Sequence, residues 1–171
     1  NPRHYTHGWH CTSTLGTIGA AAVAARLLGL DRERVAHCLA VAASEASGLK
    51  ENFVTDTKPL HAGLAARNGI VAALLARSGL TASSRALDGP QVFLNAMASE
   101  RPELGDALRT LGTRWGILES GVTTKLYPSC AATHPALDAI LDLRREHGFT
   151  ADDVEAVAIG VDAVTPTILT Y

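Results

Sequence analysis

Residues 55–63 read Thr55-Asp56-Thr57-Lys58-Pro59-Leu60-His61-Ala62-Gly63, and an alanine-rich apolar segment follows them as far as Arg77. Proline is favoured in the first turn of a helix, because its missing N–H removes no hydrogen bond there. We therefore predict a helix over residues 60–77, with Lys58 in the loop that leads into it. The start of a helix favours anions, and a lysine adds a full positive charge. Lys58 is thus either a solvated surface lysine or part of a site for a carboxylate or phosphate.

The composition predicts a globular chain with closely packed helices. Of the 171 residues, 47% are hydrophobic and only 5% are aromatic, and alanine is abundant. Small side chains let helices approach one another closely. The formal net charge of −2 argues against nucleic acid as a partner, because binding to phosphates needs a basic surface. The sequence also has neither a Walker loop nor a GxGxxG motif.

The cysteines indicate a reducing compartment. Cys11, Cys38 and Cys130 are odd in number, far apart and in no CxxC pair, which is typical of free thiols. We predict a cytoplasmic protein, with no signal peptide and no uncharged apolar run of about 18 residues that would span a membrane. The sequence begins at Asn1 in what reads as the middle of a domain, so we expect a piece of a longer polypeptide.

Apolar spacing and helix-ending residues predict a mainly α-helical fold. Residues 1–14 and 49–59 read as polar loops, and Asp31 is a good N-cap for one of the helices. The spacing of apolar residues predicts helices over 14–28, 31–46, 60–77, 91–98 and 102–111. We assign residues 1–115 to one helical domain.

The pattern changes after Gly112. Residues 122–126 and 154–164 are rich in β-branched side chains and predict two strands, with a helix from Pro135 to Gly148 between them. Strand, helix and strand in succession predict the start of a smaller α/β domain over residues 116–171.

Three clusters of polar residues could carry chemistry. One is His4, His7 and His10, one is Lys58 with His61, and one is Lys125 with Tyr127, Cys130 and His134. The first has a spacing that a zinc site could use, but loop histidines more often make local hydrogen bonds, and we predict no metal.

Two lysines and a histidine in one small site would suit a substrate that carries several carboxylates. Each ammonium group offsets the desolvation of one anion, and a histidine that is neutral near pH 7 can move a proton. Cys130 is an alternative nucleophile, although the sequence fixes no histidine beside it.

Three ordered segments resemble the MmgE/PrpD family, whose members include 2-methylcitrate dehydratase, cis-aconitate decarboxylase and iminodisuccinate epimerase. The segments are Gly8-Trp9-His10 with Leu15-Gly16, then residues 57–63 leading into Ala65-Ala66-Arg67-Asn68-Gly69, and finally Lys125-Leu126-Tyr127-Pro128 with Thr133-His134-Pro135-Ala136 and Asp138. The resemblance implies a helical domain followed by an α/β lid domain, a homodimer, no cofactor, and acid–base chemistry on di- or tricarboxylates.

Carried over by position, the resemblance assigns catalytic roles to His10, Lys58 and Lys125. It assigns supporting, substrate-binding roles to four further residues, which are His61, Cys130, Thr133 and His134. Cys130 stands where the decarboxylase-like members have a histidine, and this departure counts against decarboxylation of cis-aconitate in particular.

Three functions follow from these expectations. The first is a lyase, either a dehydratase or a decarboxylase, in which His10 is the acid or base and the lysines hold carboxylates. The second is an epimerase or isomerase that returns the proton to the opposite face of the carbon. The third is a non-catalytic piece that survives as a dimerising or interaction module. Under none of the three do we expect a membrane or nucleic-acid partner.

Overall fold

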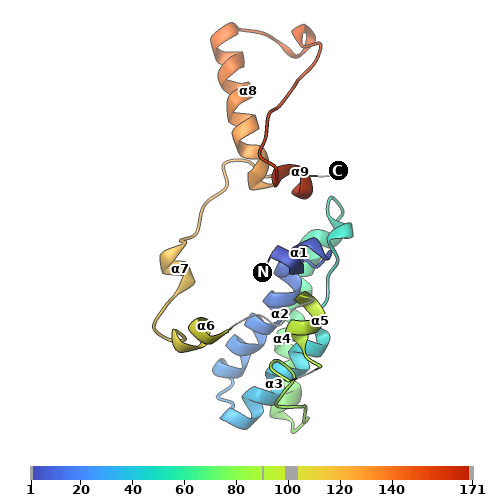
Figure 1. Cartoon of the computed structure of the whole chain (residues 1–171), viewed down its shortest axis with the longest axis vertical. Coiled ribbons are helices and arrows are strands. Elements are labelled where there is room, and N and C mark those ends of the chain that lie inside the picture. The colour runs from blue at the N-terminus through green and yellow to red at the C-terminus, as the bar shows by residue number, and fades with distance from the viewer. Residues whose placement is uncertain (1, 90, 99–103, 170–171) are drawn as a thin grey trace. The chain divides into compact units, whose positions relative to one another are not determined.

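The chain divides into two compact units, Asn1–Arg109 and Thr110–Tyr171. The structure, a computed structural model, describes residues 2–89, 91–98 and 104–169 (Figure 1). The division falls shortly before the predicted boundary at residue 115. The identity of the second unit as a lid domain stays a prediction.

Helices dominate the first unit, as the sequence predicts, and they are also the regular elements described in the second unit, for which the sequence predicts strands as well. In the first unit they are α1 (Pro2–Thr6), α2 (Cys11–Leu27), α3 (Arg32–Glu45), α4 (Thr57–Arg77), α5 (Phe93–Ala98) and α6 (Gly105–Arg109), with the 3₁₀ turn η1 (Lys50–Asn52). In the second unit they are α7 (Gly116–Glu119), α8 (His134–His147) and α9 (Thr165–Ile168), with the 3₁₀ turns η2 (Ala131–Thr133) and η3 (Ala151–Asp153).

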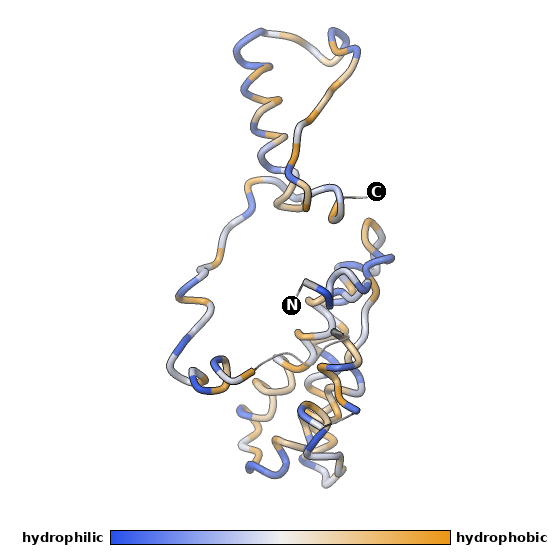
Figure 2. The backbone as a smooth tube through the Cα atoms, viewed as in Figure 1, coloured by the Kyte–Doolittle hydropathy of each residue, from blue (hydrophilic) through white to orange (hydrophobic). Residues whose placement is uncertain are grey.

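The core of the first unit is built from small side chains on α2, α3 and α4, which lie side by side (Figure 1). Its fully buried residues are Ala21, Ala25, Cys38, Ala42, Ala72, Ala73 and Ala76. Figure 2 shows hydrophobic residues along both α2 and α4. A Cβ atom on Gly69 would lie 2.5 Å from the backbone nitrogen of Ala21, so α4 passes directly over the backbone of α2. The close packing expected from the alanine content is therefore present.

Local signals fix the ends of several helices where the sequence predicts them. Asp31 caps α3, because its Oδ1 atom accepts a hydrogen bond of 2.9 Å from the N–H of Arg34. Gly148 takes the left-handed conformation, with φ 68°, directly after α8. These two residues bear out the N-cap and the helix end read from the sequence.

Two predicted loops are wrong in part. Residues 1–14 contain α1 and the first turn of α2, which begins at Cys11 because Ser13 N–H and Thr14 N–H both donate to the carbonyl of His10. Apolar spacing misses this turn because its buried residues are polar. Helix α4 begins at Thr57, so Lys58 lies in its first turn and not in the preceding loop. Pro59 fits this turn, since a first-turn residue needs no N–H.

The predicted strands do not form in the part of the chain that the structure describes. Residues 122–126 and 154–163 are unpaired chain with exposed side chains, such as Val122 at 81% and Ile159 at 58% exposure. A strand needs a neighbour that supplies hydrogen bonds to its backbone. Among residues 2–89, 91–98 and 104–169, no segment pairs with either stretch, so their β-branched side chains alone do not make a sheet.

Part of the predicted helix over 102–111 lies outside the described residues, and α6 occupies Gly105–Arg109 of it. Across the described ranges, no helix combines the length and the apolar character needed to cross a membrane.

Candidate active site

Backbone hydrogen bonds hold His10 in place on both sides. Its N–H donates to the carbonyl of Gly48 over 2.9 Å, and the N–H of Lys50 donates to the carbonyl of Gly8 over 2.7 Å. Trp9 and Leu49 form an antiparallel bridge between these contacts. His10 is also the N-cap residue of α2, with φ −89° and ψ 105°. The loop before α2 is therefore hydrogen-bonded to the loop after α3, and His10 lies where the two loops meet.

Gly48 allows the two loops to approach each other this closely. Its φ is 119°, which a residue with a side chain rarely adopts. A Cβ atom on Gly48 would lie 2.6 Å from Cβ of Ser13 and 3.6 Å from Cδ2 of His61. Glycine is thus required here both by the backbone conformation and by the space between α2 and α4.

The structure brings two predicted site residues, His10 and His61, into direct contact. Their Nδ1 atoms lie 2.8 Å apart in a buried hydrogen bond, with the two ring centroids separated by 5.0 Å. His61 is only 3% exposed and His10 only 9%. Two ring nitrogens at this distance share a single proton, because one must donate and the other accept. The two histidines therefore behave as a pair.

Phe53 and Lys58 complete the surroundings of this pair. The ring of Phe53 meets His10 edge-on at a centroid distance of 4.8 Å. The ammonium nitrogen of Lys58 lies 4.4 Å from the centre of the same Phe53 ring, a cation–π contact. Phe53 therefore contacts both the ammonium group of Lys58 and the imidazole of His10. Lys58 and His61 are three residues apart on α4 and so point to the same side of it.

Burial lowers the pKa of His10 below its ordinary value of 6.5, and the charges of His61 and then Lys58 lower it further. Each of these causes disfavours the imidazolium form. His10 is thus neutral near pH 7 and can take up a proton. Lys58 supplies a positive charge next to it, so the arrangement suits proton transfer close to a bound anion.

The histidines of the 4/7/10 spacing have different partners. His4 is buried, and its two ring nitrogens contact the carbonyl of Met97 at 2.9 Å and Oγ1 of Thr14 at 2.8 Å. His7 is exposed and contacts the carbonyl of Arg3. His4 ties α1 to α2 and α5, as a local hydrogen-bonding group does. The described residues include no group of three or more His, Cys, Asp or Glu side chains that could hold a metal ion.

The other predicted residues belong to the second unit and form a network of their own. Lys125 Nζ donates to the carbonyl of Ser129 over 2.9 Å, and Thr133 Oγ1 donates to the carbonyl of Cys130 over 2.7 Å. The ring of His134 meets Tyr127 edge-on at 5.1 Å.

Tyr127 is anchored within this second-unit network. Its hydroxyl donates to Asp138 over 2.5 Å, a bond that raises the pKa of Tyr127. The Nε2 atom of His134 is buried and has no hydrogen-bond partner among residues 2–89, 91–98 and 104–169. Four predicted site residues lie within one short stretch of the chain, namely Lys125, Cys130, Thr133 and His134. Their roles in substrate binding and catalysis stay predictions.

Sequence reasoning missed Phe53, Thr14 and Gly48. Phe53 is the one aromatic residue in the stretch 49–59 that otherwise read as a polar loop, and this isolation was the available signal. The contact between Thr14 and His4 had no signal, because the two residues are ten positions apart across a helix start.

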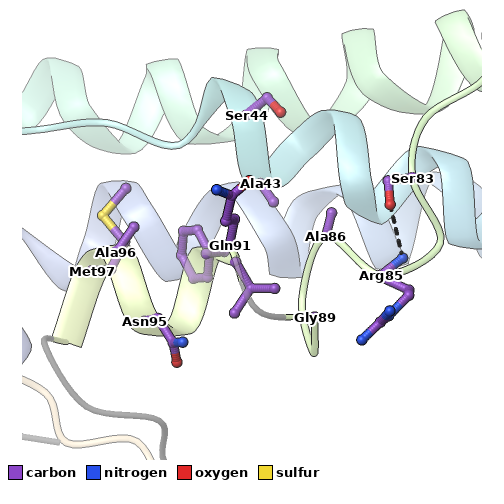
Figure 3. Close-up of a pocket in the computed structure, with 12 residues that line it drawn as sticks. Ala43, Ser44, Ser83, Arg85, Ala86, Gly89, Gln91, Asn95, Ala96 and Met97 are labelled. Carbon is purple, nitrogen blue, oxygen red and sulfur yellow. Dashed lines mark hydrogen bonds between the residues drawn. The ribbon is translucent and has the colours of Figure 1, made fainter.

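A separate hollow of about 880 Å³ lies between the end of α3, the connector before α5 and α5 itself (Figure 3). Its polar lining includes Ser44, Arg85 and Asn95, and none of the predicted site residues borders it. Figure 3 shows the backbone N–H of Arg85 bonded to Ser83, a contact within the connector. The hollow is therefore distinct from the histidine pair.

Comparison with known proteins gives a consistent result. Residues 1–104 match the MmgE/PrpD N-terminal domain. Cis-aconitate decarboxylase of Homo sapiens is 35% identical over 137 residues, which cover 80% of this chain and 28% of that protein. Cis-aconitate decarboxylase of Mus musculus is 34% identical over 163 residues, covering 91% of this chain and 33% of that protein.

A fungal cis-aconitate decarboxylase is also similar to this chain. Cis-aconitate decarboxylase of Aspergillus terreus is 29% identical over 148 residues, covering 82% of this chain and 30% of that protein. The chain thus spans about a third of the length of the curated relatives that it matches.

Proposed function

The chain belongs to the MmgE/PrpD family, and we propose that it carries part of the active site of a lyase, a dehydratase or decarboxylase, that acts on a di- or tricarboxylate. The names of the relatives, cis-aconitate decarboxylases, support a tricarboxylate as the substrate class. The single observation that carries the proposal is the buried contact between His10 and His61 beside the ammonium group of Lys58.

The chemistry of both lyase reactions needs a proton carrier and a cation. In a dehydration, a base takes a proton from the carbon next to a carboxylate, and the hydroxyl group takes up a proton and leaves as water. In a decarboxylation, a C–C bond breaks, CO₂ leaves, and the electron pair stays on the carbon until an acid protonates it. Negative charge develops next to a carboxylate in each case, and a fixed ammonium group stabilises that charge.

We assign the roles as follows. His10 carries the proton, because burial keeps its imidazole neutral near pH 7. Lys58 binds a carboxylate of the substrate at the first turn of α4, where the helix dipole adds to its charge. Lys125 binds a second carboxylate, and Cys130, Thr133 and His134 are substrate-binding residues; this part rests on the family resemblance.

A homodimer is part of the same proposal. Large apolar side chains are exposed on α2 and α4, among them Val23 at 61%, Leu27 at 82% and Ile70 at 51%. Exposed apolar patches commonly mark interaction surfaces. Light scattering at a known protein concentration gives the mass in solution, and a monomer mass at micromolar concentration would contradict this part.

The experiment uses the protein as its gene encodes it, with cis-aconitate and 2-methylcitrate as substrates and proton NMR in deuterated water as the readout. We expect an alkene-containing product, with or without CO₂. Lys58→Met should lower kcat/KM by about 10²–10³-fold. The matched control is Arg77→Met, which removes an exposed cation about 28 Å away on the same helix and should change kcat/KM less than about twofold.

Three outcomes would overturn the proposal. Deuterium exchange at the α-carbon without a new alkene or CO₂ would indicate an epimerase. No turnover of either substrate would favour a non-catalytic module. Equal activity of Lys58→Met and Arg77→Met would remove Lys58 from the site.

A further inference from the structure

The contact between the two Nδ1 atoms admits only two arrangements of neutral rings. In one, His10 donates from Nδ1, so its Nε2 carries a lone pair and can accept a proton. In the other, His61 donates, so His10 carries its proton on Nε2 and cannot act as a base. Since the contact is 2.8 Å and buried, solvent does not compete for it. The partner at Nδ1 therefore decides what the far side of the His10 ring can do.

We infer that His61 is a positioning residue that holds His10 as the Nδ1–H tautomer and so leaves Nε2 of His10 free to act as the base. This rests on the proposed function, and it replaces the substrate contact that the sequence predicts for His61. The ring of His61 is 3% exposed, and its Nδ1 atom is already bonded to His10. Little of its surface remains for a substrate to touch.

The hydrogen bond to His61 would also stabilise the imidazolium form of His10 during turnover. When Nε2 of His10 takes a proton from substrate carbon, the ring becomes an imidazolium and its Nδ1–H bond to the neutral His61 becomes charge-assisted and stronger. In a dehydration, the same proton goes from Nε2 to the substrate hydroxyl group, which leaves as water. In a decarboxylation, no proton is taken from carbon: His10 takes a proton from solvent, CO₂ leaves as the C–C bond breaks, and the imidazolium gives its proton to the carbon that keeps the electron pair. The dehydration therefore balances with the substrate's own proton, and the decarboxylation balances with one proton from water.

Gly48 lies near both histidines. An added Cβ atom on Gly48 would come within 3.6 Å of Cδ2 of His61. His10 is fixed in turn through its own N–H bond to Gly48. A turn of either ring would break the buried hydrogen bond between the two Nδ1 atoms.

The test reads the tautomer directly. In the whole protein labelled with ¹⁵N at histidine, long-range ¹H–¹⁵N spectra at pH 7.5 distinguish a protonated from an unprotonated ring nitrogen. The spectrum of His10→Gln assigns the His10 signals among those of the seven histidines of the chain. We expect His10 to show protonated Nδ1 and unprotonated Nε2 in the wild type. Protonated Nε2 with unprotonated Nδ1 would overturn the inference, and this measurement needs no substitution at His61.

Two variants then separate a positioning role from a structural one. His61→Asn keeps an acceptor oxygen near the position of Nδ1, whereas His61→Leu removes it. We expect His61→Leu to lose the Nδ1–H signal of His10 and to lower kcat by about 10²-fold or more, with KM changed less than about threefold. His61→Asn should keep the signal and stay within about tenfold of wild-type kcat.

The results distinguish the two proposals. If His61→Leu kept the His10 tautomer and kcat, or if both variants raised KM without lowering kcat, His61 would not act through His10. If the wild type showed the expected tautomer but turned over no carboxylate, the proposed lyase function would fail and the tautomer assignment would stand.

Discussion

The Nδ1 atoms of His10 and His61 lie 2.8 Å apart, although 51 positions separate the two residues along the chain. His10 ends the loop before α2, and His61 lies near the start of α4. The close packing of these helices, through Gly16, Gly69 and alanines, brings the two rings together. Helix packing and the candidate chemistry are therefore linked, and both can be tested.

The lowered pKa of His10 makes stability depend on pH in a defined direction. Below its ordinary value of 6.5, an unfolded chain takes up a proton at this residue that the folded chain does not. The free energy of unfolding should therefore fall as the pH falls from 6.5 through the lowered pKa. Urea unfolding at pH 7.5 and 5.5 measures the change, and His10→Gln should show a smaller loss than the wild type. An equal loss in both proteins would contradict the lowered pKa.

Gly69→Ala should destabilise the first unit, because the added Cβ atom would stand 2.5–2.7 Å from the backbone of Ala20 and Ala21. Overpacking of this kind costs about 1–3 kcal/mol. Gly19→Ala is the matched control, since a Cβ atom there would meet no atom of the described residues within 4 Å outside its own helix turn, and alanine favours a helix by about 0.5–1 kcal/mol. Urea unfolding should show a lower free energy of unfolding for Gly69→Ala and a higher one for Gly19→Ala. An unchanged free energy of unfolding in Gly69→Ala would mean that α2 and α4 do not approach each other as closely as the structure shows.

Gly48→Ala should impair activity as well as stability. The alanine would have to adopt the φ of 119° that Gly48 has, which is strained for a residue with a side chain. Its Cβ atom would also lie 2.6 Å from Cβ of Ser13, close to His61. We expect a loss of at least about tenfold in kcat, since small displacements of catalytic groups are costly. Gly79→Ala shares the positive φ but has open space around it, so it tests backbone strain alone. If Gly48→Ala and Gly79→Ala lowered kcat equally, the added Cβ atom next to Ser13 and His61 would not be the cause of the loss in activity.

His4→Ala should lower the free energy of unfolding by about 1–3 kcal/mol, because it leaves the Met97 carbonyl and the Thr14 hydroxyl without this partner. His7→Ala, which changes an exposed ring in the same segment, should cost less than about 0.5 kcal/mol. Thermal unfolding of the two variants side by side gives the comparison. Zinc should not stabilise the wild type, and a zinc-dependent rise in Tm would contradict the hydrogen-bonding role of His4.

The sequence allows most helices of the first unit to be predicted, because apolar spacing, Asp31 and the helix-ending glycines are local signals. It also identifies His10, Lys58 and His61 as candidates. The sequence does not reveal that His10 and His61 touch, because this contact depends on how closely α2 and α4 pack around Gly48 and Gly69.

The strand predictions failed for a related reason. β-branched residues show that a segment can be extended, but a strand also needs a partner that no local pattern supplies. The first turn of α2 was missed because its buried residues, such as Ser13 and Thr14, are polar.

The most direct test of the central claim, that His10 carries the proton in a carboxylate lyase, is the turnover of cis-aconitate and 2-methylcitrate by His10→Gln. The variant is assayed as the gene-encoded protein, after its thermal unfolding shows that it remains folded. We predict that kcat falls by about 10²–10⁴-fold relative to the wild type, as expected for the loss of an acid–base group. A folded His10→Gln protein that keeps kcat within a few-fold of the wild type would contradict this account.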